Sequence, residues 1–257
     1  IETTVVRASD PELRTQASDG GVVTALLLHL FDRNRIDGAI ISRSLGKFQR
    51  QPFLATTREE IKSAPGMFLD TSHGMERFSD AYMTFSTIEE FDPMIKKGLK
   101  RVALVGTPCQ IKALRKMKVM HLVPSDAIKV CFGLFCSGNY SFGPEDQQKL
   151  ARLADIHWKD VERINIKEEL IITLTSGEKK TLDLAELDFM KRFACHYCAD
   201  YSAEFSDISF GGIGAESGWT TVITRTPLGR AILADGRSMG SVDQFSVKDN
   251  PEFASYA

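Results

Sequence analysis

Residues 101–110 read RVALVGTPCQ, an apolar run that ends in a glycine, a proline and a cysteine. The apolar part, residues 101–105, predicts a buried strand, and the next four residues end it. We expect a helix to follow from Gln110 to about Met117. A strand that runs straight into a helix is typical of α/β folds.

The same alternation of strand and helix extends in both directions from this stretch. A capping box at residues 57–60 and a proline at the start of residues 144–154 predict two helices. Strands around Ser176-Gly177 predict a hairpin. We expect a mostly parallel sheet flanked by helices, an antiparallel hairpin and a loop-rich region, forming one domain over 1–240 with an irregular tail over 241–257. The predicted strands are 38–42, 53–56, 128–135, 164–167, 170–175, 180–183 and 220–224, with one more around Ile208 and further helices after Gly21 and from Pro227.

The composition narrows the class of protein. The chain has 257 residues, of which 43% are hydrophobic and 26% charged, and its net charge of −2 argues against a nucleic-acid partner. Five cysteines, an odd number, do not indicate a secreted disulfide framework, so we expect a cytoplasmic protein without a signal peptide. Residues 22–31 are too short an apolar run to span a bilayer, which takes about 20 residues. The first residue is Ile1, which fits a processed product or a fragment.

Four of the five cysteines are candidates for a metal site. Residues 195–198 read CHYC, a spacing that lets two thiolates bind one metal centre. Cys109 and Cys136 each follow an apolar strand, so they can converge at one edge of the sheet. One close pair with two distant single cysteines favours an iron–sulfur cluster over structural zinc, which usually has two close pairs. A thioredoxin-like redox pair is less favoured, because no strand directly precedes the motif.

Cys131 and Cys136 compete for the same role. They are five residues apart on one predicted strand, and side chains at odd separations face opposite sides of a sheet. Cys131 lies in the middle of the strand and is expected to be a buried thiol, whereas Cys136 lies where the strand ends.

Two glycine-rich segments are candidates for cofactor binding. Residues 18–24 read SDGGVVT, in which Ser18 or Asp19 can cap a helix whose first turn suits an anionic phosphate. The alternative is an ordinary capped core helix. Residues 211–218 allow close approach to a planar ligand, beside Trp219, which can stack on it or pack in the core. We expect His29 to be a satisfied core histidine and His196 a solvated one.

Taken together, these motifs resemble the beta-subunit family of coenzyme F420 hydrogenases and dehydrogenases. The resemblance runs from about Ser18 to Leu233. The segments that carry it are SDGGVVT (18–24), GTPCQ (106–110), LFC (134–136), CHYCADY (195–201), SDIS (206–209) and GWTTVITRT (218–226).

The resemblance implies FAD, one [4Fe–4S] cluster and coenzyme F420, a deazaflavin, as substrate. Hydride would pass between coenzyme F420 and FAD, and single electrons through the cluster to or from a partner redox subunit, with no dedicated catalytic residue. The implied cluster ligands are Cys109, Cys136, Cys195 and Cys198. The implied cofactor-binding residues are Ser18, Asp19, Gly20, Gly21, Val22, Thr24, Gly106, Thr107, Pro108, Gln110, Gly214, Gly218, Trp219 and Thr220.

One position departs from the family pattern. Many members carry a lysine in a segment that here reads APGMF (64–68), with Met67 in its place. This keeps open a ferredoxin-linked flavin and iron–sulfur reductase of an organic substrate. A zinc-stapled binding module is the non-enzymatic alternative. The partners that the resemblance implies are a hydrogenase, a formate dehydrogenase, a sulfite reductase or a heterodisulfide reductase module.

Overall fold

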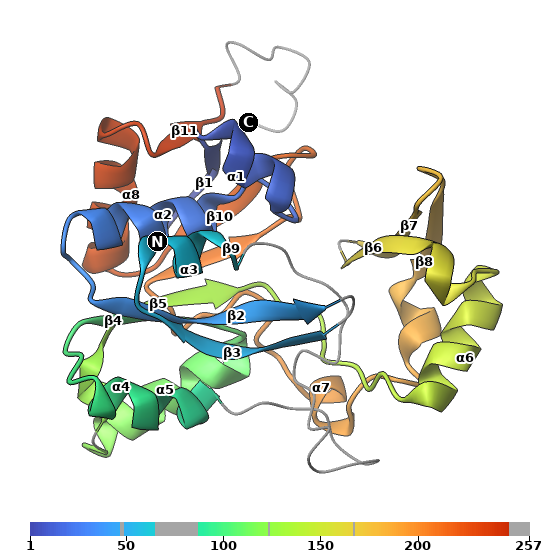
Figure 1. The fold of residues 1–257 in the computed structure, drawn as a ribbon, viewed down its shortest axis with the longest axis horizontal. Coiled ribbons are helices and arrows are strands. Elements are labelled where there is room, and N and C mark those ends of the chain that lie inside the picture. Colours follow the sequence, from blue (N-terminus) through green and yellow to red (C-terminus); the bar gives the residue numbers. More distant parts are fainter. Residues whose placement is uncertain (47–48, 65–86, 123, 167, 247–257) are drawn as a thin grey trace.

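The computed structural model describes residues 1–46, 49–64, 87–122, 124–166 and 168–246, and its centre is an eight-stranded sheet (Figure 1). The strand order is β11-β1-β10-β9-β5-β4-β2-β3. The four strands β2, β4, β5 and β9 run parallel, and the strands outside them are antiparallel. The strands are β1 (Glu2–Ala8), β2 (Gly38–Gly46), β3 (Gln49–Ala55), β4 (Val102–Gly106), β5 (Ile128–Leu134), β9 (Ile208–Gly211), β10 (Thr220–Thr224) and β11 (Val242–Gln244).

Helices cover both faces of this sheet, because successive residues of its central strands face opposite sides. In β2, Ala39 and Ile41 belong to the core packed against α2 and α8, whereas Ile40 belongs to the core packed against α4 and α5. Apolar runs buried on both faces are expected for parallel strands. The helices are α1 (Pro11–Gln16), α2 (Val22–Asp32), α3 (Arg58–Lys62), α4 (Phe91–Lys96), α5 (Pro108–Val119) and α8 (Pro227–Ser238), with short 3₁₀ helices at Thr87–Glu90 and Ser125–Ala127.

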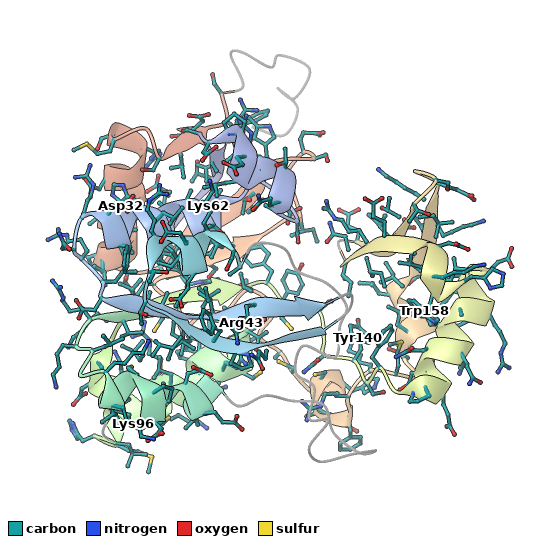
Figure 2. All side chains as sticks on the ribbon, in the orientation of Figure 1. Asp32, Arg43, Lys62, Lys96, Tyr140 and Trp158 are labelled. Carbon is teal, nitrogen blue, oxygen red and sulfur yellow. The ribbon has the colours of Figure 1, made fainter. Side chains whose placement is uncertain are left out.

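Residues between β5 and β9 form a separate small lobe, on the right of Figure 1. Its three-stranded antiparallel sheet has the order β6-β7-β8 and packs with α6 around its own hydrophobic core. In Figure 2, Trp158 lies within this lobe and Tyr140 lies where the lobe joins the rest of the protein. Its elements are α6 (Pro144–Ala154), β6 (Val161–Ile166), β7 (Glu169–Leu174) and β8 (Lys179–Asp183), with 3₁₀ helices at Trp158–Asp160 and Leu184–Leu187, and α7 (Phe193–His196) follows it.

The predicted fold class is confirmed, with the parallel strands confined to the middle of the sheet. Helix α6 has the predicted bounds, and the capping box of Thr57 and Glu60 is present. Several elements differ from the sequence analysis. Strand β1 and the helices α1, α4 and α7 were not predicted, and β11 lies in the part expected to be an irregular tail. Met67 lies outside the described residues.

Candidate functional site

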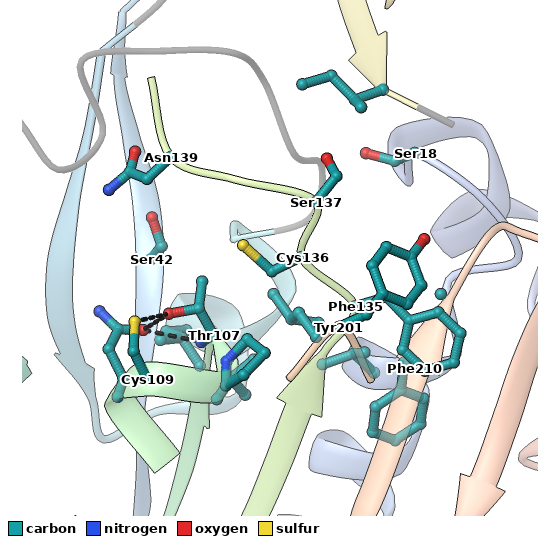
Figure 3. A pocket seen from close by; sticks show the side chains of 18 of the residues that line it. Ser18, Ser42, Thr107, Cys109, Phe135, Cys136, Ser137, Asn139, Tyr201 and Phe210 are labelled. Carbon is teal, nitrogen blue, oxygen red and sulfur yellow. Dashed lines mark hydrogen bonds between the residues drawn. The ribbon is translucent and has the colours of Figure 1, made fainter. Parts of the chain in front are cut away.

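A cavity of about 680 Å³ lies at the carboxyl ends of the parallel strands β4, β5 and β9 (Figure 3). In open α/β sheets this edge is where ligands bind. The volume is within the range of roughly 300–1,000 Å³ that holds small molecules and cofactors. Residues that follow all three strands line it: Thr107 and Cys109 after β4, Phe135 and Cys136 after β5, and Gly212 and Ile213 after β9.

Cys109 lies in the first turn of α5, at the mouth of this cavity. Thr107 caps the helix, and its backbone N–H donates to Gln110 Oε1 at 2.9 Å. The Thr107 hydroxyl is 3.3 Å from Cys109 Sγ (Figure 3). This cap starts the helix at Pro108, earlier than the sequence predicted, because proline is favoured at the first helical position. Cys109 is exposed and therefore accessible to a ligand in the cavity.

Cys136, Cys195 and Cys198 line the same cavity as Cys109. The backbone N–H of Asn139, three residues after Cys136, donates to Cys195 Sγ at 3.3 Å, and this contact ties the two segments together. The pKa of the Cys136 thiol is raised to about 12, mainly by burial and in smaller part by the charges of the three other thiols. Four thiols from three distant stretches of sequence are therefore electrostatic neighbours.

The four thiols line the cavity but are not grouped as the ligands of a single metal ion. Within the described part of the chain, no three His, Cys, Asp or Glu side chains form a group that could hold one metal ion. Cys131 is fully buried in the core on the α5 side of the sheet, as its position in the strand predicts. Its backbone N–H donates to Asp207 at 2.8 Å, and Arg115 lies 3.2 Å from the same carboxylate.

The N-terminal turn of α2 forms another wall of the cavity. Ser18, Asp19, Val22 and Thr24 line it, as does Gly21. The N-cap position of α2 is held by Gly21 at φ 72°, not by Ser18 or Asp19, which the sequence analysis expected there. The first turn of α2 borders the cavity, and N–H groups at a helix N-terminus suit an anion.

The glycine-rich segment after β9 enters the cavity only in part. Gly211, Gly212 and Ile213 line it, and a Cβ on Gly212 would lie 2.7 Å from an oxygen of Asp19. Trp219 does not line the cavity, since it packs against Arg7 and Phe245 at 4.4 and 5.0 Å between centres. Of the predicted cofactor-binding residues, those that line the cavity are Ser18, Asp19, Gly21, Val22, Thr24, Thr107, Pro108, Gln110 and Thr220, and those that do not are Gly20, Gly106, Gly214, Gly218 and Trp219.

Several lining residues were not found from the sequence. Phe135 and Tyr201 form a ring pair with centroids 5.4 Å apart beside Cys136. The Tyr201 carbonyl accepts from the Cys136 N–H at 2.9 Å. Asn165 and Arg192 come from the small lobe and its connection. Phe135 and Tyr201 lie inside the segments 134–136 and 195–201, so their position beside the cysteines is the signal from which they could have been found.

The fold and the site define an α/β protein with a cofactor-sized cavity bordered by four thiols. Residues 99–249 of this chain match the family model of the C terminus of the coenzyme F420 hydrogenase/dehydrogenase beta subunit. Residues 3–77 match the family model of the N-terminal part of the same subunit. The chain belongs to this family, which confirms the resemblance drawn from its motifs. In the described residues, no helix is both long and apolar enough to cross a bilayer.

Three similar proteins illustrate the family. The beta subunit of coenzyme F420 hydrogenase from Methanothermobacter thermautotrophicus is 29% identical over 252 residues, covering 96% of this chain and 85% of that protein. The coenzyme F420-dependent sulfite reductase of Methanocaldococcus jannaschii is 28% identical, covering 84% of this chain and 34% of that protein. A chain in the structure of the F420-reducing [NiFe] hydrogenase complex from Methanosarcina barkeri superposes with a TM-score of 0.81 at 26% identity, covering 97% of this chain and 83% of that one.

Proposed function

We propose that this protein is the flavin and iron–sulfur subunit of a coenzyme F420-dependent oxidoreductase. It exchanges hydride with coenzyme F420 and passes single electrons to or from a partner redox subunit. The observation that carries the proposal is that four cysteines and the first turn of α2 line one cavity. The proposed substrate is supported by the relatives of this chain, which include a subunit of coenzyme F420 hydrogenase and coenzyme F420-dependent sulfite reductase.

The donor set fits a [4Fe–4S] cluster held by Cys109, Cys136, Cys195 and Cys198. Four thiolates are the usual ligands of this cluster. All four line one cavity, so they would be available together to hold the cluster. The buried Cys136 thiol would lose its proton on binding iron, so the metal offsets the cost of burial there.

The same cavity would hold FAD. A flavin accepts a hydride and releases electrons singly, which is the conversion that a deazaflavin and a cluster require between them. The protein's part is to bind and orient. The first-turn N–H groups of α2 would suit the pyrophosphate, and Gly212 and residues 107–110 line the same cavity.

The test is anaerobic purification followed by iron, sulfide and flavin analysis. We expect iron and sulfide in the ratio of one cubane cluster, FAD in equal amount to protein, and bleaching of the flavin by reduced coenzyme F420. A sample that contains zinc and neither iron nor flavin would refute the redox function. Flavin reduction by reduced ferredoxin but not by coenzyme F420 would refute the proposed substrate alone.

A further inference from the structure

The small lobe is joined to the rest of the protein through a stem that adjoins two of the cysteines. The lobe begins after Cys136 and returns just before Cys195. Across the stem, the Arg192 N–H donates to the Asn139 carbonyl at 2.8 Å, and the Asn139 N–H donates to Cys195 Sγ at 3.3 Å. Tyr140 forms the first bridge of the lobe, with Lys191. One end of the lobe is thus attached beside the thiols.

The lobe also contacts the turn before α2, which lines the same cavity. Arg163 Nη2 donates to the Ser18 carbonyl at 2.8 Å, and Asn165 Nδ2 is 3.5 Å from the same oxygen. The first distance is that of a strong charge-assisted hydrogen bond, and the second is at the limit of a weak one. These contacts join residues 145 and 147 positions apart in the sequence.

The pleat of β6 explains why both donors reach one acceptor. Ile164 is fully buried in the core of the lobe, so Arg163 and Asn165, on either side of it, face the other way. They point towards the main sheet, and Asn165 and Ile166 line the cavity together with Ser18 and Gly21. The cavity therefore has walls from both parts of the protein.

The cores of the two parts are separate. Residues of the lobe form one hydrophobic core, and those of the main sheet form two others. Parts that share little apolar surface are held in their relative positions by individual polar contacts. The hydrogen bond from Arg163 to the Ser18 carbonyl is such a contact between the lobe and the turn before α2.

We propose that Arg163 is a positioning residue of the cofactor cavity, which latches the small lobe onto the Ser18 carbonyl and so holds the first turn of α2 against a bound flavin. The residue does not itself line the cavity; it acts through Ser18 and the turn that ends at Gly21. The part that concerns flavin rests on the proposed function, whereas the latch itself does not.

The latch is tested without any cofactor, by amide hydrogen exchange on the metal-free and flavin-free full chain. Arg163→Ala is compared with Arg163→Lys, which keeps a cationic donor, and with Arg152→Ala, an exposed position on α6 of the same lobe. We expect exchange in residues 18–24 to rise about tenfold in Arg163→Ala, to be largely restored by lysine, and to stay unchanged in Arg152→Ala. Equal exchange in the wild type and Arg163→Ala would overturn the latch.

Flavin binding is then measured on the holoprotein by the recovery of free FAD fluorescence on dilution. We expect the dissociation constant to rise about tenfold in Arg163→Ala, which corresponds to the loss of about one charged hydrogen bond, with iron content unchanged. A normal flavin affinity in a variant whose exchange has risen would overturn the role in positioning. A wild type that binds no flavin would refute the proposed function, and the exchange experiment would still decide on the latch.

Discussion

Cys131→Ser and Cys195→Ser exchange the same atom, but we expect opposite results because the two thiols have different surroundings. Cys131 is fully buried in an apolar core, and burial raises its pKa to about 11, so at neutral pH it is a protonated, apolar group. A serine hydroxyl at this position would give up its hydrogen bonds to water and would be surrounded by apolar side chains. The free energy of unfolding should fall by about 1–3 kcal/mol, while iron binding is retained.

Cys195 is half-buried and lines the cavity, where its Sγ accepts from the Asn139 N–H. A serine oxygen can accept the same bond and remains close to solvent. The metal-free protein should therefore change in stability by no more than about 0.5 kcal/mol. Iron binding should be lost, because a hydroxyl is a much poorer iron ligand than a thiolate at neutral pH.

Two measurements on each variant separate these effects. Iron and sulfide per chain after anaerobic purification report the cluster, and urea denaturation of the metal-free protein reports the fold. The matched pair controls for the chemistry of the substitution, since both variants lose one sulfur. Equal loss of iron in Cys131→Ser and Cys195→Ser, with equal stability, would refute the assignment of ligands.

Three further predictions concern other parts of the protein. Asp207→Ala leaves Arg115 and the backbone N–H of β5 without their carboxylate, so we expect a loss of about 3–5 kcal/mol in urea denaturation, with Asp207→Asn losing less. Gly212→Ala places a methyl group against Asp19, and flavin affinity should fall with little change in melting temperature. The hydrogen bond from Arg101 holds the pKa of Asp37 below its usual 3.8. The stability that the ionised Asp37 contributes is therefore present above pH 4 and is lost as the pH falls further. In Asp37→Asn, the free energy of unfolding should depend less on pH below pH 4.

Much of the fold follows from local sequence signals. Signals a few residues apart predict three of its elements: the helix at Pro144–Ala154, the capping box at Thr57 and the hairpin of β7 and β8. These signals can be recognised without knowing the rest of the chain. Strand β1 is different: its partners are β10 and β11, more than 200 residues away, as in the pair of Glu2 with Thr224. Its sequence carries no sign of that pairing.

The candidate site divides in the same way. The residues that follow strand ends, such as Cys109 and Cys136, could be assigned from sequence, since the carboxyl ends of parallel strands meet at one edge. Whether they bind a cluster remains a prediction. The role of Trp219 was open between stacking on a ligand and packing, and only its contacts with Arg7 and Phe245 decide for packing.

The sequence by itself determined the α/β class, the family and which four cysteines line the cavity. Each of these could be predicted from short motifs, because their residues lie close together in the sequence. The tertiary structure alone decided that Gly21 is the N-cap of α2, that a lobe with its own core lines part of the cavity, and that Arg163 reaches the Ser18 carbonyl. The physical reason is that such contacts depend on how separately folded parts pack. A hydrogen bond across 145 residues leaves no periodicity or spacing in the sequence from which it could be predicted.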